Sequence, residues 1–143
     1  LQDADGVTTI VRDRLTGTGT HACVWRFHLA PGLEAEIRAE GVRLAGQKGE
    51  VWLVPADVPP ALRLSVQEGW VSPSYGVRQP SLVVVGEATV EAPTTAVFAF
   101  APAPLSQEAR EECLVLLGRI EDQVVGPATD ERRTEGRTSR TKA

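Results

Sequence analysis

Two histidines are the residues of this sequence best suited to acid–base or metal chemistry. His28 follows Trp25 and Phe27 on an alternating segment and falls on the face opposite their rings. An imidazole at a strand end can bind a metal or carry a proton. The pattern by itself nevertheless favours a surface histidine with a hydrogen-bond partner. His21, which begins the same segment after a turn, is predicted to be a plain surface residue.

A second group of candidate residues is aromatic. Trp70 and Tyr75 lie among turn residues in the segment 69–77. Aromatic rings beside a loop can stack on the apolar faces of sugars, which makes both of them candidate carbohydrate-binding residues. The same rings can close the open end of a β-sandwich core, and the pattern favours this structural role.

Motifs for common catalytic machinery are missing from the sequence. It has no Gly-x-Ser-x-Gly elbow, no His-Glu-x-x-His zinc helix and no glycine-rich phosphate loop between a strand and a helix. Most carboxylates alternate outward on predicted strands, so we expect solvated faces rather than a glycosidase pair.

Cys23 and Cys113 lack CxxC spacing. Two buried thiols are the favoured interpretation, a disulfide is the alternative, and a zinc site is not expected.

Composition narrows the class of protein. The 143 residues suit one domain, and a formal net charge of −4 gives no electrostatic case for nucleic acid. No apolar run is long enough to span a membrane. The sequence contains no methionine and begins with Leu1, which we interpret as a fragment whose natural start lies upstream. The lack of a visible signal peptide therefore says nothing about secretion.

Alternation of apolar and polar residues predicts an all-β fold, an antiparallel β-sandwich, for residues 1–104. Turns are expected at Gly17–Gly19 and Pro31–Gly32, and a hairpin turn at Gly46–Gly49. The continuous apolar run Ser81–Val85 indicates a strand buried on both faces. The predicted strands are Thr8–Leu15, His21–Leu29, Glu34–Ala39, Val42–Leu44, Val51–Val54, Ala61–Gln67, Ser81–Val85 and Thr94–Phe100.

The period then changes, which predicts a C-terminal helix over residues 105–126 with Ser106 as its N-cap. We expect its apolar stripe to pack on the domain, with docking on a partner as the minor alternative. The stripe comprises Cys113, Leu116, Leu117, Ile120 and Val124. Residues 127–143 lack large apolar side chains and are predicted to be a disordered tail.

Several short motifs, in their order and spacing, resemble the β-sandwich of heparinase II/III-like polysaccharide lyases. They are Ile10–Leu15, Gly17–His21, Phe27–Gly32, Ser72–Val77 and the strand after Pro93. The resemblance covers about residues 7–101. It implies a C-terminal, supersandwich-like sheet domain that follows an N-terminal (α/α) toroid in a secreted or periplasmic protein.

The resemblance also implies a function. Such enzymes cleave acidic, uronic-acid-containing polysaccharides by β-elimination, with a tyrosine or histidine that removes the proton beside the uronate carboxyl group. Most of that machinery belongs to the toroid, so Tyr75 is not matched to the catalytic tyrosine. The sheet domain of the family often holds a divalent metal, zinc or calcium, and His28 matches its last ligand. Asp3 and Asp5 match none of the other ligands.

Two alternatives stay open at this point. One is a non-catalytic carbohydrate-binding module that uses Trp70 or Tyr75. The other is a structural or interaction sandwich with no role in glycan recognition. Neither the identity of the polysaccharide nor the oligomeric state follows from the sequence.

Overall fold

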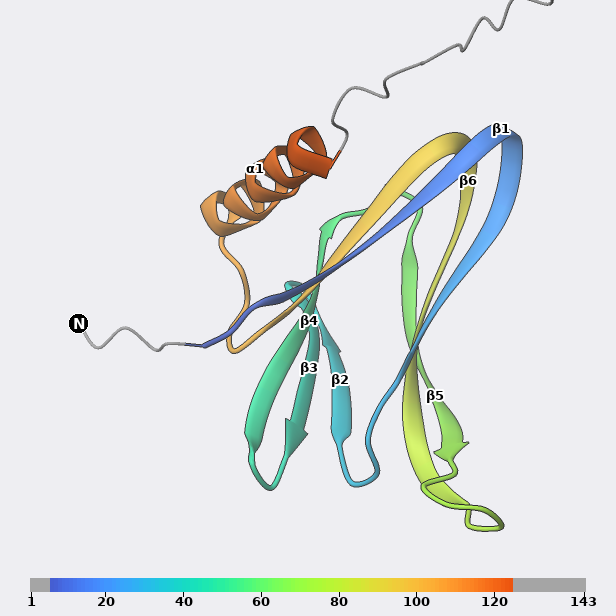
Figure 1. The fold of residues 1–143 in the computed structure, drawn as a ribbon. Helices are drawn as coiled ribbons and strands as arrows, with labels where there is room; N and C mark the ends of the chain where they lie inside the picture. The colour runs from blue at the N-terminus through green and yellow to red at the C-terminus, as the bar shows by residue number, and fades with distance from the viewer. Residues whose placement is uncertain (1–5, 125–143) are drawn as a thin grey trace, which may run out of the picture.

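The structure, a computed structural model, describes residues 6–124 and folds them into six β-strands and one α-helix (Figure 1). The elements are β1 (Thr9–His28), β2 (Glu34–Arg38), β3 (Gly41–Gly46), β4 (Gly49–Asp57), β5 (Arg63–Val71), β6 (Gln79–Ala101) and α1 (Gln107–Val124). The predicted class, an antiparallel β fold with one C-terminal helix, is confirmed. The predicted tail 127–143, Asp3 and Asp5 lie outside the described residues.

Strand β6 organises the sheet. One of its edges pairs with β1, while its other edge pairs first with β5 and then with β4. Strands β3 and β2 continue the sheet beyond β4, and every pairing is antiparallel. The sheet bends so that β2 contacts β5, which brings its two halves face to face as a sandwich (Figure 1).

The bend falls where the sequence predicted the end of a strand. The prediction of a turn at Gly17–Gly19 is wrong, because β1 continues through these residues. Strand β6 likewise joins two segments that were predicted to be separate strands. Gly17 and Gly19 have φ angles of 118° and 86°, which glycine adopts without steric cost, so the chain bulges instead of reversing. The register shifts between Leu15 and Gly19, opposite Pro93, which has no N–H to donate to the ladder.

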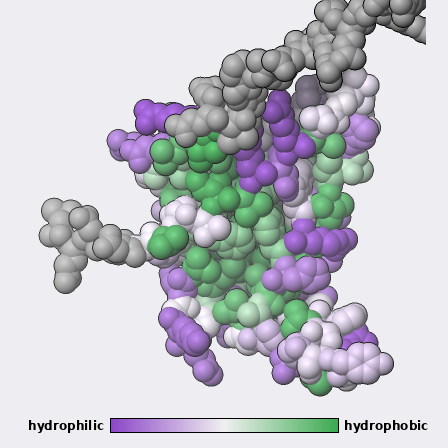
Figure 2. Space-filling view, in the orientation of Figure 1, coloured by the Kyte–Doolittle hydropathy of each residue, from purple (hydrophilic) through white to green (hydrophobic). Residues whose placement is uncertain are grey.

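The core lies between the two halves of the sheet. Phe98 of β6 is fully buried, and its ring centroid lies 5.0 Å from that of Phe27 and 5.8 Å from that of Trp25. Burying a ring of this size stabilises the fold by about 2–3 kcal/mol. The other buried members of the cluster are Leu29, Val42, Leu44, Leu53, Val84 and Ala96. In Figure 2 apolar side chains gather over the middle of the visible face.

The second half of β1 confirms the predicted alternation. Trp25, Phe27 and Leu29 point to the core, whereas Arg26 and His28 are exposed. The run Ser81–Val85 is buried on both faces as predicted, apart from the half-buried Leu82.

Helix α1 is attached to the sheet mainly near its first turn. The Ser106 hydroxyl accepts a hydrogen bond from the Ala109 N–H at 3.1 Å, the contact expected of an N-cap. Arg110 then donates to the carbonyl groups of Pro55 and Glu40, each at 3.5 Å. These bonds link the start of the helix to β4 and to the turn between β2 and β3.

The orientation of the helix differs from the prediction. Cys113 and Leu117 are half-buried, but Leu116 and Ile120 are 53% and 57% exposed. The helix makes few contacts with the sheet, so a narrow strip of its surface covers the domain, while Leu116 and Ile120 face outward. The side chain of Val124 lies outside the described residues. Within residues 6–124, no helix has the apolar length that crossing a bilayer requires.

The cysteines are not joined. Cys23 on β1 and Cys113 on α1 are free thiols, so the alternative of a disulfide is not realised. Both are half-buried rather than fully buried.

Candidate functional site

Strands β5 and β6 form a hairpin whose connecting loop, residues 72–78, projects from the lower end of the sheet in Figure 1. The loop contains a tight turn in which the Val77 N–H donates to the Ser74 carbonyl group at 3.1 Å. Gly76 has a φ angle of 75°, the conformation that a type II turn requires at its third position. Tyr75 therefore occupies the corner of the turn, and its side chain is fully exposed.

Trp70 lies at the end of β5, opposite Pro80 in the ladder. Alternation places it on the same face as Leu64 and Val66, which pack against the core. Trp70 is 52% exposed and is not a member of the core cluster, because the hairpin extends past the end of the sandwich. A large part of the indole ring is thus available to a ligand.

Arg78, the last loop residue before β6, completes the hairpin tip. Its guanidinium carbon lies 3.8 Å from the centroid of the Trp70 ring, in cation–π contact. Such a contact contributes about 0.5–1 kcal/mol at an exposed site. Arg78 is not among the site residues predicted from the sequence, although a tryptophan and an arginine flanking a short turn are a recognisable signal for cross-strand stacking.

His28 lies elsewhere. It is opposite Val83 on the outer face of the sheet, its side chain is exposed, and it makes no hydrogen bond within residues 6–120. On its other side, Val83 pairs with Gln67 of β5. Among the described residues, no three or more histidine, cysteine or acidic side chains form a group that could hold a metal. The described residues therefore do not form a metal site by themselves, and the role of His28 as a ligand stays a prediction.

His21 has a local structural contact. Its Nε2 lies 3.0 Å from the Thr18 carbonyl oxygen, which can only accept, so Nε2–H donates. This bond holds the ring of His21 over the bulge of β1.

The predicted site residues thus separate into two places. Trp70 and Tyr75 belong to one hairpin, together with Arg78. His28 and Trp70 lie on opposite faces of the sheet. Side chains alternate along a strand, and this alternation places Trp70 on the face towards the core and His28 on the outer face.

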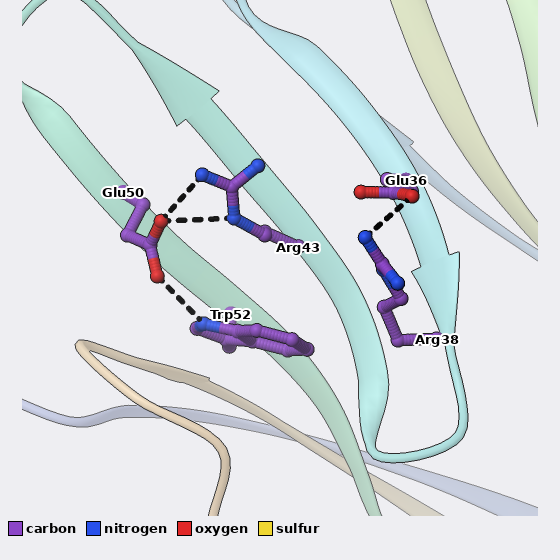
Figure 3. Close-up of polar contacts among 5 residues, drawn as sticks. All are labelled: Glu36, Arg38, Arg43, Glu50 and Trp52. Atoms are coloured by element: carbon purple, nitrogen blue, oxygen red, sulfur yellow. Dashed lines mark hydrogen bonds and ion pairs between the residues drawn. The ribbon is translucent and has the colours of Figure 1, made fainter.

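The outer face of the β2–β3–β4 layer carries a different polar arrangement (Figure 3). Glu50 accepts hydrogen bonds from Arg43 Nε at 2.9 Å and from Trp52 Nε1 at 3.3 Å, and Arg38 pairs with Glu36 at 2.7 Å. The bond from Arg43 first, and that from Trp52 second, hold the pKa of Glu50 below its ordinary value of 4.5. These charges are satisfied within the layer.

An open cleft with a volume of about 290 Å³ lies inside the bend. Its walls include Leu15, Trp25 and the thiol-bearing Cys23, and Asp13 is its one carboxylate. Acid–base hydrolysis of glycosides ordinarily uses two carboxyl groups, and the described walls of this cleft carry one.

One family model that matches the chain covers most of its length. The model described as "Heparinase II/III-like, C-terminal" matches residues 1–110, which is 110 of the 143 residues. The matched range contains all six strands and the first turn of α1. Comparisons with curated proteins and with solved structures gave no match.

Proposed function

The chain belongs to the heparinase II/III-like C-terminal family, and from this membership we propose that it is the C-terminal sheet domain of a polysaccharide lyase. The parent enzyme would cleave uronic-acid-containing polysaccharides by β-elimination, outside the cytoplasm, in the periplasm or as a secreted protein. The observation that carries the proposal is the family match across all six strands.

In this proposal the chain supports the catalytic cleft rather than supplying the reacting groups. β-Elimination removes the proton beside the uronate carboxyl group, breaks the C–O bond to the leaving sugar and forms a C=C bond without adding water. The base acts on a proton of low acidity, so the neighbouring carboxylate must be neutralised as negative charge develops. We place these groups on an N-terminal (α/α) toroid, against which the sheet domain would pack.

The test of this function uses the complete protein that contains this chain. It would be incubated with alginate, heparin and a neutral glucan, and the ultraviolet absorbance of the unsaturated uronate product would be followed. We expect absorbance to rise with at least one acidic polymer and not with the glucan. No rise with a broad panel of uronate polymers, from a protein shown to be folded, would remove the lyase proposal.

We also propose that His28 is one ligand of a divalent metal, zinc or calcium, in the complete protein. An imidazole nitrogen favours zinc over calcium, which prefers oxygen ligands. His28 is exposed and lacks a hydrogen-bond partner within residues 6–120, so its ring is available to a ligand set that the described residues do not supply.

Metal analysis of the complete protein tests this role. We expect His28→Ala to lower the bound metal, and His21→Ala, the matched control, to leave it unchanged because His21 bonds to Thr18. Equal metal content in the wild type and His28→Ala would exclude His28 as a ligand.

A second candidate function is a non-catalytic carbohydrate-binding module. The observation that favours it is the exposure of Trp70 and Tyr75 on one projecting hairpin. The two functions make different predictions: a binding module holds glycan but the complete protein leaves it uncut, whereas a lyase domain belongs to a protein that cuts it.

A further inference from the structure

We propose that Arg78, held against Trp70 at the tip of the β5–β6 hairpin, binds the carboxylate of an acidic sugar and gives the tip a preference for uronates over neutral glycans. This inference rests on the proposed function, which supplies acidic polysaccharide as the ligand class. It adds a charged recognition residue to the two aromatic residues already considered.

The first observation is how Arg78 differs from two other arginines of the sheet. Arg38 and Arg43 each pair with a glutamate at 2.7 Å, so their charges are neutralised inside the protein. Arg78 instead contacts the face of the Trp70 ring at 3.8 Å, and no described carboxylate pairs with it. Stacking occupies the flat face of a guanidinium and leaves its N–H groups, which point outward in its plane, able to donate.

The second observation is the local charge. The protein carries a formal net charge of −4, yet the 18 residues from Gly69 to Gly86 contain no aspartate or glutamate. Arg78 is the one charged residue of that stretch. Glu68, two positions before Trp70 on the same face of β5, is the carboxylate nearest to Trp70 along the chain, and it makes no ion pair with Arg78. The charge of Arg78 is therefore left to complement an acidic ligand.

The third observation is the fixed geometry of the turn. The Ser72 hydroxyl donates to the Ser74 carbonyl group at 2.9 Å, and the Val77 N–H donates to the same carbonyl group at 3.1 Å. These bonds hold Tyr75 at the corner with its ring fully exposed. A rigid aromatic residue can pack on the C–H face of a sugar with little loss of conformational entropy, while Arg78 binds the carboxylate.

Affinity measurements on the full 143-residue chain test the inference. Alginate tetrasaccharide presents carboxylates alone, heparin tetrasaccharide presents carboxylates and sulfates, and maltotetraose is neutral. We expect the wild type to bind at least one acidic tetrasaccharide at millimolar or lower concentration and to bind maltotetraose more weakly. Because a charge-assisted hydrogen bond at an exposed site is partly screened, Arg78→Ala should raise the Kd for the acidic sugar about three- to tenfold.

The matched control is Arg38→Ala, which removes the same charge from an arginine that pairs with Glu36. It should leave the Kd within about twofold, because Glu36 already neutralises the charge of Arg38 in the wild type. Arg78→Lys keeps the charge but loses the planar fork, and should recover part of the affinity. Circular dichroism of each variant confirms that the fold is intact.

Three results would overturn the inference. They are no binding of either acidic tetrasaccharide by the wild type, equal losses in Arg78→Ala and Arg38→Ala, or binding to poly-glutamate as tight as to the sugars, which would indicate an acidic protein partner. The lyase assay is separate: a complete protein that cuts no polymer while Arg78→Ala loses binding contradicts the proposed function and leaves this inference standing.

Discussion

The β3–β4 layer and the β5–β6 hairpin tip use the same pair of residue types in opposite ways. In the layer, Trp52 is only 9% exposed and Arg43 bonds to Glu50. At the tip, Trp70 is 52% exposed and Arg78 rests on its ring. The difference is the presence of a carboxylate. Where a glutamate pairs with the arginine, the arginine stabilises the layer. Where no described carboxylate pairs with it, an aromatic and cationic surface is left for a ligand.

The largest expected effect concerns the two tryptophans. Trp52→Ala should lower the free energy of unfolding by about 3 kcal/mol, because it removes a buried ring and leaves a cavity. Trp70→Ala should lower it by no more than about 1 kcal/mol, the value of an exposed cation–π contact. Urea denaturation of the full chain measures both, and equal losses would contradict the division between a structural layer and a recognition tip.

A smaller effect is expected from the turn that holds Tyr75. Gly76→Ala should destabilise the protein by about 1–2 kcal/mol, because its φ angle of 75° is costly for a residue with a Cβ. Thermal unfolding measures the loss. The matched control, Gly118→Ala, has open space around the added Cβ in α1 and should stabilise the protein by about 0.5–1 kcal/mol. A neutral Gly76→Ala would mean that the turn is not fixed as described.

The smallest effect is the pH dependence of the layer. The pKa of Glu50 is lowered in the folded protein, first by its hydrogen bond from Arg43. Its contribution to stability is therefore complete above the unfolded pKa, ordinarily 4.5, and is lost as the pH falls through the lowered folded value. We expect Glu50→Gln to lose stability relative to the wild type at about pH 6, and the difference to shrink towards about pH 3.

Unfolding midpoints measured across that pH range check this expectation. A difference between Glu50→Gln and the wild type that does not change with pH would show that the Arg43 bond does not depend on the charge of Glu50. Because Glu50 is a surface group, the effect should be below those of Trp52 and Gly76.

Much of the fold could be predicted from local alternation. The faces of Trp25 and Phe27, the buried run Ser81–Val85 and the Ser106 cap all follow from patterns within a few residues. The continuity of β1 through Gly17–Gly19 could not, because a pair of glycines permits both a turn and a bulge, and the long partner strand β6 decides between them.

The candidate site was only partly predictable. Trp70 and Tyr75 were identified by residue type, but the contact of Arg78 depends on the hairpin register that places it beside Trp70. The exposure of Leu116 on the outward face of α1 could not be predicted. Helical periodicity shows that apolar residues share one face of a helix, but it does not show which element packs against that face.

The central claim is that the hairpin tip, and not the ion-paired layer, faces acidic glycan. A titration of the ¹⁵N-labelled 143-residue chain with alginate and heparin tetrasaccharides, followed by amide chemical shifts, tests it most directly. We expect the largest shifts to map to residues 70–79 and the signals of residues 43–52 to stay unchanged. Shifts concentrated in residues 43–52, or no shifts anywhere with either sugar, would contradict it.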